Sequence, residues 1–287
     1  MSERARTIRS FTVVTPCLQA EERIAATARS VMAQTALLRG RVRVEYLVCD
    51  GGSTDRTLTV VREVCGDGAK VISREDHGLY HGLAKGLHAA TGDVVCYLNA
   101  GDVYHPAAFD VVADLFETGR VRWLTGHTLI ASERGEVLQV RLPYRFRRRH
   151  VRQGLYGTAV RQSIQQDATF WDRSLHRLLD LDQLAGLRLA GDYYLWIRFA
   201  GEEELHVVDT HLSTLLLHAG QLSEDAEGYR RELATLVEPS GRWDRLLARW
   251  DERRARHANP SRLSRRDPEH LWRFDWARRT WRTRSGP

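Results

Sequence analysis

The chain has 287 residues, of which 43% are hydrophobic and 28% are charged, a composition typical of a folded globular protein and not of a disordered or fibrous one. Its formal net charge of +6 comes without a recognised nucleic-acid-binding motif, which disfavours a nucleic-acid partner. No apolar run reaches the roughly 20 residues that cross a bilayer, and the first ten residues lack a signal-peptide apolar core, so we expect a cytoplasmic protein.

The first hundred residues alternate between predicted strands and helices. Apolar runs predict strands at residues 11–16, 44–49, 70–73 and 94–98, and apolar side chains at helical spacing predict helices at 21–34, 55–64 and 79–90. Repeated alternation of this kind indicates an α/β fold, in which a mostly parallel, Rossmann-like central sheet is flanked by helices.

After residue 102 the alternation is less regular. We predict helices at 106–116 and 192–199 and strands at 121–125, 136–142, 205–208 and 212–218. Residues 145–163 carry many cations and little periodicity, which indicates a loop or a short basic helix.

The four cysteines predict neither a metal site nor a disulfide framework. Cys17, Cys49, Cys65 and Cys96 lack the close paired spacings of zinc and redox motifs. Three of them lie in or next to predicted strands, where a thiol packs as a small apolar side chain. We therefore expect reduced cysteines that serve packing.

Three predicted strands end in polar or glycine-containing turns. Pro16 ends the first strand, Asp50 ends the second ahead of two glycines, and Asn99 to Asp102 follow the strand at 94–98. Ligands of open α/β folds bind at the carboxyl ends of the strands. We therefore expect these turns to line one site, where a carboxylate suits a metal-bridged diphosphate.

Four sequence blocks resemble a known family in their order and spacing. They are DGGSTDRT from Asp50, EDHGLYHGLAKGLHAATGD from Glu75, YLNAGDVYHP from Tyr97 and GDYYLWIR from Gly191. Together they resemble the family 2 nucleotide-sugar glycosyltransferases, whose catalytic domain has the A-type glycosyltransferase (GT-A) fold. The resemblance implies a catalytic, nucleotide-sugar-binding domain at residues 1–220 and leaves residues 221–287 as a basic, Trp- and Arg-rich helical extension.

The resemblance also implies the reaction. Enzymes of this family invert the anomeric centre as they move a sugar, here expected to be a hexosyl group, from a nucleotide-diphosphate sugar such as a UDP-sugar to a hydroxyl acceptor. The acceptor class, whether a glycan, a lipid-linked molecule or a small molecule, stays open.

Residue roles follow from the same resemblance. Asp192 matches the catalytic base, although an Asp at a helix start is also a common N-cap. Asp50 matches a nucleoside-binding carboxylate or is a plain turn residue, and Lys85 matches a donor contact or is an exposed helix lysine. The expected nucleotide-sugar-binding residues are Pro16, Asp50, Asp76, Gly78, Lys85 and Asn99.

The acidic motif of the family is reduced in this chain. Where relatives often read Asp-x-Asp-Asp, the aligned residues are Asn99, Ala100, Gly101 and Asp102, so one carboxylate remains. Asp102 and His218 are the expected ligands of a divalent Mn²⁺ or Mg²⁺ ion, although a lone His at a strand end is also an ordinary structural residue. On the acceptor side we expect Gln166, Asp167 and Trp196.

The extension holds five of the eight tryptophans among many arginines, and helices are predicted at 229–237, 241–257 and 268–280. Such helices either lie on a membrane surface or pack their tryptophans on the catalytic domain or on a second subunit, and we favour packing.

Two other functions remain open. A nucleotidyltransferase would share the α/β layout, but the turn after the first strand lacks the Gly-rich, basic signature of that class. A catalytically weakened sugar-nucleotide-binding or scaffolding protein is suggested by the reduced acidic motif.

Overall fold

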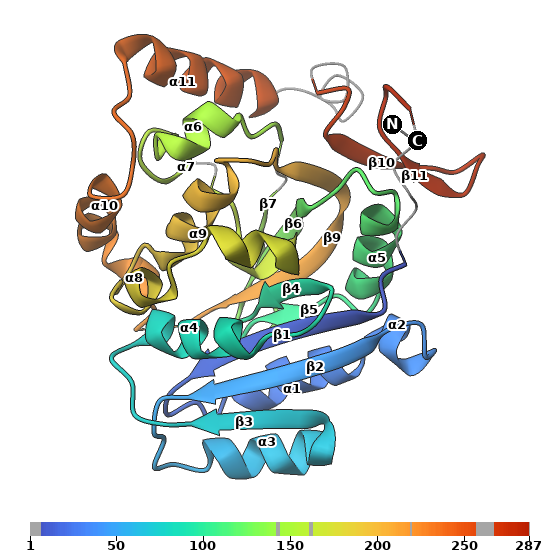
Figure 1. Cartoon of the computed structure of the whole chain (residues 1–287), viewed down its shortest axis with the longest axis vertical. Helices are drawn as coiled ribbons and strands as arrows, with labels where there is room; N and C mark the ends of the chain where they lie inside the picture. Colours follow the sequence, from blue (N-terminus) through green and yellow to red (C-terminus); the bar gives the residue numbers. More distant parts are fainter. Residues whose placement is uncertain (1–6, 142–143, 161–162, 219, 257–266, 287) are drawn as a thin grey trace.

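The protein is described by a computed structural model that covers residues 7–141, 144–160, 163–218, 220–256 and 267–286. One central sheet crosses the molecule (Figure 1). Its eleven strands, counted over these residues, follow the order β11-β10-β9-β6-β8-β4-β1-β2-β3, with β5 paired to β9 and β7 paired to β6.

The strands are β1 (Ser10–Cys17), β2 (Arg43–Asp50), β3 (Ala69–Ser73), β4 (Val94–Tyr97), β5 (Val103–Tyr104), β6 (Trp123–Ser132), β7 (Val137–Arg141), β8 (Thr169–Asp172), β9 (His206–Leu217), β10 (Leu271–Asp275) and β11 (Thr280–Arg282). The helices are α1 (Ile24–Met32), α2 (Thr35–Leu38), α3 (Thr57–Cys65), α4 (Leu79–Ala89), α5 (Ala108–Glu117), α6 (Arg148–Arg152), α7 (Leu155–Thr158), α8 (Leu181–Ala185), α9 (Gly191–Phe199), α10 (Ala226–Ala234) and α11 (Arg242–Arg256). Short 3₁₀ turns occupy Gly66–Gly68, Gln166–Ala168, Arg173–Leu178 and Leu222–Glu224.

The N-terminal half of the sheet is parallel, as the alternating pattern predicts. Strand β1 pairs in parallel with β2 and β4, and β2 pairs in parallel with β3. Side chains of β1 alternate between the two faces, so Val13 belongs to one apolar cluster and Val14 to the other. The carboxyl ends of these strands therefore lie at one edge of the sheet.

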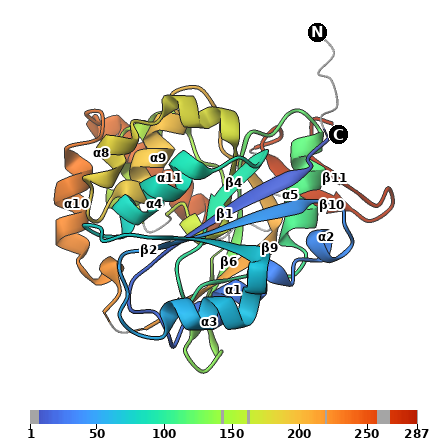
Figure 2. The ribbon, with the colours of Figure 1, turned by 60° about the horizontal axis from the view of Figure 1, so that its bottom comes forward.

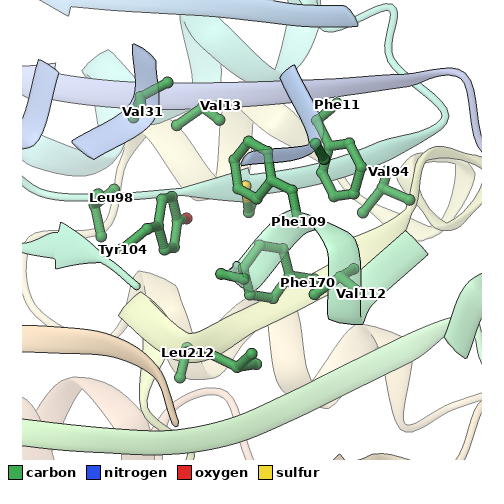
Figure 3. Packing of buried hydrophobic residues seen from close by; sticks show 14 of the residues in the cluster. Phe11, Val13, Val31, Val94, Leu98, Tyr104, Phe109, Val112, Phe170 and Leu212 are labelled. Atoms are coloured by element: carbon green, nitrogen blue, oxygen red, sulfur yellow. The ribbon is translucent and has the colours of Figure 1, made fainter. Parts of the chain in front are cut away.

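Helices cover both faces of this sheet (Figure 2). On one face, α1, α3 and α5 enclose a core in which Phe11 and Phe109 stack with ring centroids 4.5 Å apart, next to Phe170 (Figure 3). On the other face, α4, α8 and α9 enclose the second core cluster. This layered arrangement confirms the predicted α/β architecture.

The C-terminal half of the sheet is mixed. Strand β8, which the sequence pattern did not indicate, inserts between β4 and β6 and is antiparallel to both. The two strands predicted at 205–208 and 212–218 form one continuous strand, β9, which runs parallel to β6. The basic segment predicted as a loop or a short helix contains α6 and α7.

The extension after residue 220 is only partly helical. Helices α10 and α11 confirm two of the three helices predicted there. The helix predicted at 268–280 is wrong, because this segment forms β10 and β11, and β10 pairs in parallel with β9. Trp272 is fully buried in this strand, and its indole N–H donates to Nδ1 of His206 over 3.0 Å.

The structure also describes the cysteines and the lengths of the helices. All four cysteines are free thiols, three of them buried. Within the described residues, no helix combines the length and the apolar character needed to cross a bilayer.

Candidate active site

Asp50 lies at the carboxyl end of β2 and is fully buried. Its carboxylate accepts hydrogen bonds from the backbone N–H groups of Gly52 (3.1 Å) and Ser53 (3.1–3.2 Å) and from the hydroxyl of Ser73 (2.7 Å). Asp50 therefore shapes the turn after β2 and ties it to the end of β3.

Asp76 lies next to this turn. A Cβ atom added to Gly51 would lie 2.8 Å from Oδ1 of Asp76, so the carboxylate rests directly on the glycine backbone. Lys85 of α4 holds the carboxylate there, because its ammonium group lies 3.3 Å from Oδ2 of Asp76 and also donates to the carbonyl groups of Arg74 (2.8 Å) and Glu75 (3.3 Å).

Helix α4 begins at Leu79, shortly after Asp76 in the sequence. Gly78 precedes it with a φ of +132°, a conformation that favours glycine, and its N–H donates to Oδ1 of Asp76 over 3.2 Å. Pro16 packs against the next turn of the helix, since a Cβ on Gly82 would lie 3.3 Å from the Cβ of Pro16. Pro16, Asp50, Asp76, Gly78 and Lys85 are thus brought together at one edge of the sheet.

Helix α4 also reaches the start of α9. The hydroxyl of Tyr80 donates to the carbonyl group of Leu189 over 3.0 Å. A Cβ on Gly191 would lie 2.4 Å from the Tyr80 ring, so the close approach of α4 to α9 requires glycine at this position. The next residue, Asp192, lies in the first turn of α9.

Asp192 is half-buried, and its carboxylate lies among the side chains of Tyr80 and Tyr229 and the backbone of Tyr193. Burial raises the pKa of Asp192 from its ordinary value of 3.8 to about 6, and hydrogen bonds from the Tyr193 N–H and the Tyr229 hydroxyl oppose the rise. The two donors lie 2.7 Å and 3.4 Å from Oδ1. A carboxylate with a pKa near neutrality suits a general base.

Helix α10, outside the blocks that carry the family resemblance, completes this part of the site. It supplies Tyr229, and it also supplies Glu232, whose carboxylate accepts the N–H groups of Arg188 (2.8 Å), Leu189 (2.7 Å) and Ala190 (2.6 Å) just before α9. The sequence pattern predicted a helix here but gave no sign that its side chains contact Asp192.

The turn after β4 faces inward. Asp102 is 5% exposed, and its carboxylate accepts the Leu216 N–H over 3.1 Å and the Gln166 side-chain amide over 3.4 Å. Burial, and after it the charge of Asp167, raises the pKa of Asp102 well above its usual range. Asp167 is itself fully buried and accepts a hydrogen bond from Ser213.

Gln166 and Asp167 therefore lie with Asp102 and not apart from it. Burial raises the pKa of Asp167, while the hydroxyl groups of Ser213 and Thr128 oppose the rise. Oδ1 of Asp167 is buried with no hydrogen-bond partner among the described residues, and so is Oδ1 of Asn99 in the same turn.

A cationic side chain lies over this turn. Where the family motif has a second carboxylate the chain has Gly101, and a Cβ there would lie 3.5 Å from Cδ of Arg23. Nε of Arg23 is buried and has no hydrogen-bond partner in the described part of the chain.

The described residues contain no group of three or more His, Cys, Asp or Glu side chains that could hold a metal ion. His218 follows β9 two residues after Leu216, at the end of the strand that contacts Asp102. Asp102 and His218 are the two ligands expected here, and two side chains among the described residues do not complete a preformed divalent-metal site.

Trp196 is a core residue. It is fully buried and stacks on Trp123 with ring centroids 5.8 Å apart, with Trp171 edge-on at 6.0 Å. The structure thus gives no support to the expected contact with an acceptor, because the apolar face of α9 turns this side chain away from solvent.

Tyr97 of β4 lies near both groups of carboxylates. Burial raises its pKa, and the charges of Asp192 and Asp167 add to the rise. Contacts thus run from the β2 turn through Asp76 and α4 to Gly191, the residue before Asp192. The charges that act on Tyr97 place Asp167, and with it the Asp102 turn, near the same group.

A sequence profile described as glycosyl transferase family 2 matches residues 12–168, more than half of the chain. An uncharacterized glycosyltransferase of Nostoc sp. is 33% identical over 101 residues, which cover 34% of this chain and 30% of that protein. The chain thus spans less than a third of the length of this curated relative.

Solved structures share the fold at low sequence identity. Staphylococcus aureus TarS 1–349 in complex with UDP-GlcNAc superposes with a TM-score of 0.60 at 15% identity, over 79% of this chain and 65% of that one. Mycobacterium tuberculosis glucosyl-3-phosphoglycerate synthase, in complex with Mn²⁺, UDP and phosphoglyceric acid, gives 0.51 at 22% identity, over 81% of each chain. A TarS chain of which 37% is covered gives 0.54.

Proposed function

The chain belongs to glycosyl transferase family 2, and on that premise we propose that it transfers a hexosyl group from a UDP-sugar to a hydroxyl acceptor with inversion of the anomeric centre. The UDP preference rests on the similarly folded TarS and glucosyl-3-phosphoglycerate synthase, which were crystallised with UDP-GlcNAc and UDP. The observation that carries the proposal is the half-buried Asp192 carboxylate with its raised pKa, which α4 joins to the segment around Asp76 and Gly78.

Asp192 is the base in the proposed reaction. It takes the proton of the acceptor hydroxyl as the hydroxyl oxygen attacks the anomeric carbon. The new glycosidic bond forms while the bond from that carbon to the diphosphate oxygen breaks, and the diphosphate leaves with the electron pair. A pKa of about 6 leaves Asp192 largely ionised at neutral pH and still basic enough to accept the proton.

The donor lies over the turns after β1, β2, β3 and β4 in this proposal. Asp50 and Asp76 with Pro16 form the nucleoside side, and Gly78 and Asn99 offer backbone and amide groups to the rest of the donor. Lys85 is a positioning residue, because its ammonium group holds the Asp76 carboxylate and the backbone carbonyl groups beside it.

The leaving diphosphate needs a cation. Glucosyl-3-phosphoglycerate synthase was crystallised with Mn²⁺, but the described side chains around Asp102 in this chain do not fit a preformed metal site. We assign the neutralising role to Arg23, whose side chain lies over Gly101 and whose guanidinium carries a buried, unpartnered N–H.

The test compares Asp192→Asn with wild type in a transfer assay, after a thermal-shift screen of UDP-, GDP- and dTDP-sugars has chosen the donor. Loss of the base should lower kcat by about 10²–10⁴-fold and leave donor binding unchanged. Asp182→Asn, in the exposed first turn of α8, is the matched control and should retain full activity.

The second candidate function is a sugar-nucleotide-binding scaffold, which the carboxylate-free Gly101 position favours. Calorimetric binding of a sugar nucleotide, with neither hydrolysis nor transfer to any acceptor of a broad panel, would support the scaffold. Near-normal transfer by Asp192→Asn would instead show that the base is another residue.

A further inference from the structure

Helix α11 buries its acidic face and exposes its apolar face. Asp244, Ala248 and Glu252 point toward the protein and are 9%, 1% and 9% exposed. The opposite face carries Trp243 (83% exposed), Leu246 (52%), Leu247 (38%) and Trp250 (48%). The spacing of these four residues places them in one line along the helix, and we call them the α11 stripe.

Ion pairs fix this orientation. Oδ2 of Asp244 lies 3.0 Å from the Arg149 guanidinium and 3.0 Å from the Gln153 amide. Nε of Arg147 lies 2.6 Å from Oδ2 of Asp251. An amphipathic helix on a globular protein usually turns its apolar side inward, so α6 holds α11 in the reverse of the common arrangement.

Arginines lie along one side of the α11 stripe and over Trp250. The exposed cations of the helix are Arg242, Arg245, Arg249, Arg253 and Arg254. The acidic residues Asp244 and Glu252 are buried, and Asp251 is paired with Arg147. The guanidinium of Arg254 lies 3.6 Å from the centre of the Trp250 ring. The outward surface of α11 is therefore apolar along the stripe and cationic along one side of it.

We infer that the α11 stripe docks on an anionic lipid bilayer. Tryptophan side chains sit at the boundary between hydrocarbon and head groups, and arginines bind the phosphates of anionic lipids. A second copy of this chain fits less well, because a two-fold contact places the same patch against itself and would bring the arginines of both copies together. Nucleic acid would match the arginines and leave the apolar side chains without a partner.

The docked helix is connected to the catalytic centre of the proposed function. Helix α6 lies beside α11 (Figure 1), and the Arg148 guanidinium of α6 donates to the carbonyl groups of Ala200 (3.0 Å) and Gly201 (2.6 Å) at the end of α9. Asp192 is in the first turn of that helix. The lipid contact itself does not depend on the proposed function.

Co-sedimentation of the full chain with vesicles tests the inference. We expect binding to phosphatidylcholine mixed with phosphatidylglycerol, at least about tenfold tighter than to phosphatidylcholine alone, and weaker binding as salt rises. Trp243→Ser combined with Trp250→Ser should lower the affinity about tenfold or more. Both side chains are exposed, so circular dichroism and the melting temperature should match wild type.

Trp276→Ser is the matched control, because Trp276 is 84% exposed in the turn between β10 and β11. It should bind vesicles as wild type does. Absence of vesicle binding, equal binding by the double variant, or an equal loss in Trp276→Ser would each overturn the inference. So would a dimer, detected by ultracentrifugation without lipid, that the double variant dissociates.

Discussion

Asp192 carries a charge that the fold disfavours. Because its pKa rises from 3.8 to about 6 on folding, the protonated form is favoured in the native state, and the free energy of unfolding decreases as the pH rises from about 4 to about 6. We expect Asp192→Asn to remove this cost and to stabilise the protein at pH 7.5 by up to about 3 kcal/mol. Chemical unfolding at pH 7.5 and pH 4 measures the difference, which should vanish at the lower pH.

Tyr229 partly offsets the rise that burial causes in the pKa of Asp192. Its hydroxyl donates to the carboxylate and lowers the pKa of that group, so Tyr229→Phe should raise it. The acidic limb of the kcat profile should then move upward by about 0.5–1 pH unit. Tyr194→Phe, on α9 as Asp192 is, loses a hydrogen bond to the Asp180 carbonyl group and is the control. An unshifted limb in Tyr229→Phe would assign the ionisation to another group.

Arg23 is expected to bind the donor diphosphate. Arg23→Met should weaken UDP binding about tenfold or more, the usual size of a lost charge-assisted hydrogen bond. Arg29→Met, an exposed position on the same helix, should not change it. Titration calorimetry with and without Mn²⁺ also separates the two sources of positive charge. If Mn²⁺ fully restores the UDP affinity of Arg23→Met, the metal ion and not Arg23 neutralises the diphosphate.

At the scale of elements, the contact between α10 and α9 positions Asp192, the proposed base. Glu232 accepts three backbone N–H groups ahead of α9, and an amide in its place can accept at only one atom. We expect Glu232→Gln to cost about 1.5–3 kcal/mol in stability and to lower kcat while the donor KM stays unchanged. Glu227→Gln in the exposed first turn of α10 is the control. An increased donor KM with kcat unchanged would contradict this assignment.

Elements whose patterns are local were predictable. The strands and helices of the first hundred residues follow from apolar spacing, and the structure has each of them. The strands of segment 268–280 were not predictable, because Trp272 and its neighbours fit helical spacing equally well. Only the pairing of β10 with β9 selects the strand. Strand β8 was missed for the same reason, since four residues gain their conformation from β4 and β6 on either side.

The candidate site residues likewise include some that a local motif indicates and some that only distant contacts bring into place. Asp50, Asp76 and Asp192 could be proposed from the sequence because each follows or begins an element with a readable motif. Tyr229, Glu232 and Arg23 could not be proposed from the sequence, because their proposed roles depend on helices that are distant in the sequence and meet only in the fold. Asp167 was placed on the acceptor side, but the return of β8 between β4 and β6 sets it beside Asp102, a contact between segments far apart in the sequence.

At the scale of the whole molecule, the division at residue 220 does not separate two independent cores. Leu233 of α10 and Trp272 of β10 are fully buried, and β10 extends the central sheet. A chain that ends at residue 220 would lose both side chains, each worth about 2–5 kcal/mol when removed from a core. We expect it to be unfolded or molten, with weak near-ultraviolet circular dichroism. Cooperative unfolding of the shortened chain near the wild-type temperature would restore residues 1–220 as an independent domain.

The tight approach of Tyr80 to Gly191 has a kinetic consequence. One turn of α4 touches both the loop that begins at Asp76 and the residue just before Asp192, with no room for a methyl group between them. A sugar nucleotide that binds against Gly78 would shift α4. Helix α4 would in turn shift Asp192, the proposed base, before the hydroxyl acceptor binds. Such coupling favours an ordered sequence in which the nucleotide enters first and its diphosphate departs last, so the diphosphate product should inhibit competitively against the donor.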